Sequence, residues 1–141
     1  MMFKRILVGL DGSAGSKRAL SAAIRLAAEQ GAELIAVSVE ERLPHYAAMV
    51  GEVEEAKQQA NEYFARVQRE AYDRAKQAGI ELRCVTLAGH AAQRIVEYAN
   101  AEKVDLLVLG HSGHTGVWGQ FLGTTADKIV RHAPCSVLIV R

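Results

Sequence analysis

The sequence predicts an α/β fold, a doubly wound five-stranded parallel sheet with helices on both faces. Five short apolar runs recur along the 141 residues, and longer segments with helical spacing lie between them. Three of the runs are continuous rather than alternating, which is typical of strands buried on both faces of a parallel sheet. Because strands and helices alternate without a linker or a repeat, we expect one domain over residues 1–141 with right-handed crossovers.

The predicted strands are short runs of mainly aliphatic residues. They cover residues 6–8, 34–37, 82–87, 106–109 and 137–140. In a sheet of this kind, ligands bind beyond the carboxyl ends of the strands, where the strand order reverses. A site is therefore expected in the segments that follow the strands, which are residues 10–13, 39–42, 88–91 and those from 110 onward.

The first helix is predicted by apolar residues at three- and four-residue spacing after the first strand. These residues are Ala19, Leu20, Ala23, Ile24, Ala27 and Ala28. Ser13 or Ser16 can cap the start of this helix, because a serine hydroxyl accepts from a free N–H group of the first turn. Gly31 ends it at the position that a left-handed cap requires.

The longest helical pattern covers residues 52–77 and is closed by Gly79. Its apolar stripe consists of Val53, Ala56, Ala60, Phe64, Val67, Ala71 and Ala75. A coiled-coil face is one interpretation, but an alanine-rich stripe is weak for a heptad seam, so a helix lying on the sheet is favoured. Shorter patterns predict helices over residues 91–102 and 125–132, and residues 43–46 are expected to form a loop in the second crossover.

Composition excludes several classes of protein. Half of the residues are hydrophobic, and 17 basic against 16 acidic side chains give a net charge of +1. We therefore expect neither a nucleic-acid nor a membrane partner. The first apolar run breaks at Asp11, too early for a signal-peptide core, so a cytoplasmic protein is expected. Cys84 and Cys135 lack the paired spacing of a metal or redox site, and we expect two reduced thiols.

The most informative segment is the glycine-rich stretch between the fourth strand and the last helix. It holds five of the twelve glycines, Gly110, Gly113, Gly116, Gly119 and Gly123. Glycines let backbone N–H groups approach a ligand closely. Gly123, Thr124 and Thr125 then offer free N–H groups, two hydroxyls and the positive end of a helix dipole, which together favour a phosphate. An ordinary surface loop is the alternative that glycine content alone allows.

The glycine spacing resembles the nucleotide-binding motif of the universal stress protein family. Two residues separate Gly110 from Gly113, nine separate Gly113 from Gly123, and a hydroxyl residue follows. The first strand and turn, residues 6–13, and the closing segment, residues 125–141, are similar to the same family. The resemblance covers essentially the whole chain. It implies an adenine nucleotide alpha hydrolase-like fold with the strand order 3-2-1-4-5.

The resemblance also implies a binding role for particular positions. Asp11 would lie at the ribose and phosphate side of an adenine nucleotide, and Val39 would meet the adenine through its backbone. The full set that the resemblance implies is Leu10, Asp11, Val39, Leu109, Gly110, Ser112, Gly113, Gly123, Thr124 and Thr125. For Asp11 alone, a turn residue capping the following helix is the alternative. The assignment of Val39 depends on the resemblance only.

One departure from the family affects how phosphate would be held. Many members carry a basic residue where Ser112 stands, and no lysine or arginine occurs from Gly110 to Asp127. Phosphate would then depend on backbone N–H groups, hydroxyls and His111 or His114, although each histidine can equally be a solvated loop residue. We expect ATP or AMP as the ligand, with Mg²⁺ positioned through Asp11.

The chain offers no recognisable catalytic or metal-binding set. His114 breaks the G-x-S-x-G pattern around Ser112, and no P-loop lysine follows the glycines. His111 and His114 have only Asp127 near them as a further ligand, fewer than a zinc site needs. Hydrolysis of bound ATP, if it occurs, is expected to be slow.

The sequence supports two functions. The leading one is an adenine-nucleotide-binding module in regulation or stress response, and the alternative is a nucleotide-independent dimeric scaffold. The apolar strand from Val137 to Val140 would be an unprotected sheet edge, and the resemblance implies a homodimer paired through it. Trp118 and Phe121 could pack across that interface or cover the nucleotide.

Overall fold

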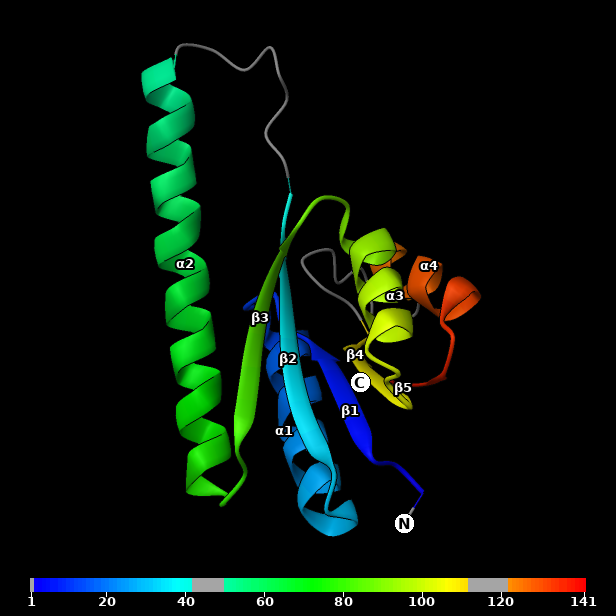
Figure 1. The fold of residues 1–141 in the computed structure, drawn as a ribbon. Helices are drawn as coiled ribbons and strands as arrows, with labels where there is room; N and C mark the ends of the chain where they lie inside the picture. Colours follow the sequence, from blue (N-terminus) through cyan, green and yellow to red (C-terminus); the bar gives the residue numbers. More distant parts are fainter. Residues whose placement is uncertain (1, 42–49, 112–121) are drawn as a thin grey trace.

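Five parallel strands form one sheet in the order β3-β2-β1-β4-β5, as predicted (Figure 1). The computed structural model describes residues 2–41, 50–111 and 122–141, so the loop expected over residues 43–46 lies outside the described residues. The elements in chain order are β1 (Arg5–Gly9), α1 (Ala14–Gln30), β2 (Glu33–Glu40), α2 (Val50–Gln77), β3 (Leu82–Ala88), α3 (Ala91–Ala101), β4 (Leu106–Gly110), α4 (Thr124–His132) and β5 (Ser136–Val140). Every predicted strand and helix is present.

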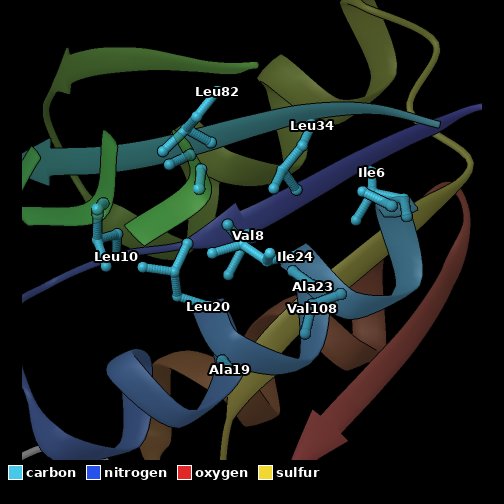
Figure 2. Packing of buried hydrophobic residues seen from close by; sticks show 14 of the residues in the cluster. Ile6, Val8, Leu10, Ala19, Leu20, Ala23, Ile24, Leu34, Leu82 and Val108 are labelled. Atoms are coloured by element: carbon cyan, nitrogen blue, oxygen red, sulfur yellow. The ribbon is translucent and has the colours of Figure 1, made fainter. Parts of the chain in front are cut away.

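Alternation along the central strands creates two separate hydrophobic layers. In β1, Ile6 and Val8 face the layer beneath α1 and α2, while Leu7 faces the layer beneath α3 and α4. Figure 2 shows the first layer, where Leu20 and Ile24 of α1 pack toward the β1 side chains. All three β1 side chains are fully buried, as expected of a strand covered on both faces.

The caps of α1 follow from local sequence chemistry. Ser13 is the N-cap, and its hydroxyl accepts from the Ser16 N–H at 3.1 Å. Gly31 has φ 63°, the left-handed conformation that glycine adopts without a steric penalty. Of the two serines that could cap this helix, the structure therefore uses Ser13.

The ends of the other helices lie within two residues of their predicted positions. Helix α2 begins at Val50, and α3 ends at Ala101. Helix α4 begins at Thr124 rather than Thr125, because Gly123 takes the extended N-cap conformation with φ −57° and ψ 150°. This shift makes Thr124 the first helical residue.

Helix α2 lies on the sheet only through its C-terminal half. Val67, Ala71 and Ala75 of the predicted stripe are buried, whereas Phe64 is half-buried. Figure 1 shows the N-terminal end of α2 reaching beyond the carboxyl ends of β2 and β3. The C-terminal part of the stripe therefore packs on the sheet, whereas its N-terminal part extends beyond the strand ends.

Both cysteines are free and partly buried. Burial raises the pKa of the Cys84 thiol, and burial together with the nearby Asp105 carboxylate raises the pKa of Cys135. A raised pKa lowers the thiolate fraction and with it the reactivity. Among the residues that the structure describes, no helix is both long and apolar enough to cross a membrane.

Candidate functional site

A cleft of about 700 Å³ lies at the carboxyl ends of β1, β2 and β4. The chain leaves β1 for β2 on one side, while β4 pairs on the other, so this is the point where the strand order reverses. The volume is in the range of small-molecule sites. The cleft brings together eight of the ten predicted residues, Leu10, Asp11, Val39, Leu109, Gly110, Gly123, Thr124 and Thr125. Ser112 and Gly113 lie outside the described residues.

The turn after β1 is held by hydrogen bonds from three elements. The Ser13 N–H donates to the Asp11 carboxylate at 2.9 Å, so Asp11 is a turn residue as well as part of the cleft wall. The buried Ser38 hydroxyl of β2 donates to the Leu10 carbonyl at 2.7 Å. From α2, the Tyr63 hydroxyl donates to the Asp11 carbonyl at 2.6 Å. Such fixed backbone and side-chain groups can bind a ligand with little cost of reorganisation.

Gly110 is required by close packing as well as by its place in the cleft. A Cβ atom on Gly110 would lie 2.6 Å from the carbonyl carbon of Gly15 and 2.7 Å from its oxygen. The first turn of α1 therefore lies directly against the end of β4. The sequence assigned Gly110 to ligand contact through the family resemblance, and it did not indicate this second constraint.

The start of α4 presents backbone donors at the cleft, and no side chain of the described residues caps them. Gly123 has no side chain to cap the helix, and the first intrahelical bond runs from the Asp127 N–H to the Gly123 carbonyl at 2.8 Å. The N–H groups of the preceding first-turn residues have no acceptor within the helix. Thr124 and Thr125 are exposed and line the cleft. This arrangement suits an anion such as phosphate.

The charged side chains that line the cleft are acidic among the described residues. They are Asp11 and Glu41, and no described lysine, arginine or histidine lines the cleft. His111 is buried, with 8% of its surface exposed, and its backbone N–H donates to the Val140 carbonyl at 2.8 Å. It does not line the cleft. His114, Trp118 and Phe121 lie outside the described residues.

Two aromatic residues of α2 line the cleft and were not predicted as site residues. Tyr63 and Phe64 form an edge-to-face pair with ring centroids 5.5 Å apart and an interplanar angle of 71°. The sequence pattern placed Phe64 in the core stripe and gave Tyr63 no role. Neither residue lies in a segment that follows a strand, so the rule that located the other site residues could not find them.

The remaining wall is apolar and comes from the hydrophobic layer beneath α3 and α4. Val37 and Leu109 contribute from the strands, and Ile95 and Ile129 contribute from α3 and α4. An apolar wall beside an uncapped helix start can receive a molecule with a flat apolar part and an anionic part. Among the described residues, no cluster of three or more His, Cys, Asp or Glu side chains could hold a metal ion.

Comparison with known proteins identifies similar chains over the full length. The sequence model of the universal stress protein family matches residues 2–141. A universal stress protein of Thermus aquaticus is 38% identical, with 99% of this chain and 100% of that protein covered. The solved structure of UspA from Lactobacillus plantarum is 25% identical and has a TM-score of 0.91, covering 100% of this chain and 99% of that one. A universal stress protein solved in complex with cAMP is 29% identical, with a TM-score of 0.76 over 100% of this chain and 99% of that one.

Proposed function

This chain belongs to the universal stress protein family, and from that premise we propose that it binds an adenine nucleotide, ATP or AMP, in the cleft above β1, β2 and β4. Its role would be that of a regulatory or stress-response binding module. The observation that carries the proposal is the joint position of Asp11, Val39 and the uncapped start of α4 around one cleft. The similar protein solved with cAMP supports an adenine ligand.

Each part of the cleft suits one part of such a ligand. The apolar wall that includes Val37, Val39 and Leu109 suits the adenine ring, whose burial removes apolar surface from water. The backbone N–H groups and hydroxyls of Thr124 and Thr125 suit the phosphate. Asp11 would hold Mg²⁺ when a polyphosphate is bound. Turnover of bound ATP would be slow, because no lysine or arginine of the described cleft wall could stabilise the charge that develops during phosphoryl transfer.

Any small molecule that copurifies with the protein provides the first test of this proposal. Mass spectrometry of small molecules released from freshly purified protein should detect an adenine nucleotide, and added AMP should raise the unfolding temperature. An empty site together with no thermal shift by AMP or ATP would instead favour the nucleotide-independent scaffold.

AMP and ATP are expected to bind with affinities that differ by less than about tenfold, or about 1.4 kcal/mol. The physical reason is the absence of a basic side chain from the described cleft wall, so additional phosphates gain no charge-assisted bond to lysine or arginine. The segment from Gly110 to Asp127 adds none, because it contains neither residue type. Isothermal titration with AMP, ADP and ATP in the presence of Mg²⁺ measures the difference. A hundredfold preference for ATP would contradict this prediction.

We also propose a homodimer paired through the strand from Val137 to Val140. Strand β5 lies at the edge of the sheet, where β4 is its one neighbour among the described strands, and Leu138 is 37% exposed. An apolar edge with unpaired backbone groups readily pairs with another strand. Leu138→Lys is expected to weaken dimerisation at least about tenfold, because it places a like charge from each copy at a shared edge.

Light scattering coupled to size-exclusion chromatography measures this effect. The control is Tyr72→Lys, which adds the same charge at an exposed site on α2, where the tyrosine is 46% exposed. A wild-type protein that stays monomeric at high concentration would refute the dimer. A Leu138→Lys variant that remains as dimeric as Tyr72→Lys would place the interface elsewhere.

A further inference from the structure

Tyr63 reaches from α2 into the turn that carries Asp11, a contact that no motif in the sequence covers. We infer that Tyr63 is a positioning residue of the nucleotide site, which holds the turn from Asp11 to Ser13 in its binding conformation through the hydroxyl group. This inference rests on the proposed function, because it concerns the same cleft. It makes α2 part of the site rather than only a cover for the sheet.

The contact is specific in its geometry. The Tyr63 hydroxyl donates to the Asp11 carbonyl at 2.6 Å, a normal length for an O–H···O bond. The ring lies so close to the turn that a Cβ atom on Gly12 would be 2.1 Å from the Tyr63 hydroxyl oxygen and 2.8 Å from Cζ. Gly12 also has φ +84°, which an L side chain rarely adopts. The tyrosine hydroxyl therefore fills the space that a side chain at position 12 would take, and the positive φ favours glycine there.

Neighbouring side chains of α2 pack beside Tyr63 and beside the turn. Phe64 packs edge-to-face against its ring at a centroid distance of 5.5 Å. Val67, one turn further along α2, is buried with 8% of its surface exposed and approaches the same Gly12 position within 3.0 Å. Two residues of the helix thus contact the turn, and the better buried one anchors it to the hydrophobic layer.

The hydroxyl acts on the site through the backbone. Its acceptor is the carbonyl of Asp11, the residue whose carboxylate accepts from the Ser13 N–H at 2.9 Å. Ser13 in turn caps α1, and Ser38 holds the preceding carbonyl from β2. Asp11 and Tyr63 are both exposed, so water can hydrogen-bond to the Asp11 carbonyl once the hydroxyl is removed, and no core residue changes. A loss of ligand affinity without a loss of stability is therefore the signature of positioning.

The test is Tyr63→Phe, which removes the hydroxyl and keeps the ring. AMP affinity measured by isothermal titration is expected to fall about five- to tenfold, the loss typical of one hydrogen bond. The unfolding temperature of the ligand-free variant is expected to stay within a few degrees of wild type. Tyr72→Phe is the matched control, because Tyr72 lies on the same helix and is 46% exposed. It should bind AMP within about twofold of wild type.

A second measurement separates this inference from the proposed function. Amide hydrogen exchange of ligand-free protein reports whether the Ser13 N–H, which donates to Asp11, loses protection in Tyr63→Phe. Faster exchange with weaker AMP binding supports positioning. Weaker binding with unchanged exchange overturns it, since the hydroxyl would then contact the ligand directly, and wild-type binding also overturns it. If the wild-type protein binds no adenine nucleotide, the proposed function fails. The exchange rate of the Ser13 N–H then shows by itself whether the Tyr63 hydroxyl holds the turn.

Discussion

Gly110→Ala is expected to reduce the free energy of unfolding by about 3 kcal/mol, at the upper end of the usual cost of overpacking. The new Cβ atom would lie 2.6 Å from the carbonyl carbon and 2.7 Å from the carbonyl oxygen of Gly15. Both are backbone atoms in the first turn of α1, so no side-chain rotation relieves the clash. Urea unfolding followed by circular dichroism measures the loss as a lower midpoint concentration.

Gly79→Ala is the matched control for this substitution. Gly79 has φ +75° and nothing within 4 Å of an added Cβ atom, so its substitution costs only backbone strain of about 1–2 kcal/mol. Gly110 differs from Gly79 in both respects. Its φ lies outside the left-handed region, and an added Cβ atom would clash with the backbone of Gly15. A smaller loss in Gly110→Ala than in Gly79→Ala would show that α1 can move away from β4 at little cost.

The predictions from sequence succeeded where the determining chemistry is local. The serine cap, predicted at Ser13 or Ser16, and the left-handed end at Gly31 each depend on a few neighbouring residues, and the structure confirms both, with Ser13 as the cap. The strand order is also confirmed, but the sequence supported it through the resemblance to a family rather than through the runs themselves. The start of α4 differed by one residue, because a glycine in extended conformation and a threonine can both begin a helix.

The site was only partly predictable, for a physical reason that α2 illustrates. A helical stripe has the same spacing whether it packs on a sheet or faces a cleft, so Phe64 and Val67 belong to one pattern with two roles. Which role applies depends on where the sheet ends beneath the helix, and that follows only from the three-dimensional arrangement. Tyr63 lies 52 residues from its acceptor in the chain, and no local signal links the two.

The backbone N–H groups at the start of α4 are open to the proposed phosphate because the N-cap residue, Gly123, has no side chain that could accept from them. With φ −57° and ψ 150°, this residue has a backbone conformation open to any amino acid, so glycine is not required by strain. Aspartate is among the best N-cap residues, and its carboxylate would occupy the N–H groups proposed to bind phosphate. Gly123→Asp is therefore expected to affect stability and affinity in opposite directions.

In ligand-free protein, Gly123→Asp should stabilise the fold by about 0.5 kcal/mol, through capping and the helix dipole. AMP affinity should fall about a hundredfold, since the loss of charge-assisted hydrogen bonds costs about 1.5–3 kcal/mol and repulsion between carboxylate and phosphate adds to it. Gly123→Asn is the matched control, because it caps equally well without the charge, and it should lose only about tenfold. Adenosine, which lacks phosphate, should bind all three proteins within about threefold. If adenosine binding falls as far as AMP binding in Gly123→Asp, the phosphate does not lie at the start of α4, and the substitution acts by distorting the cleft.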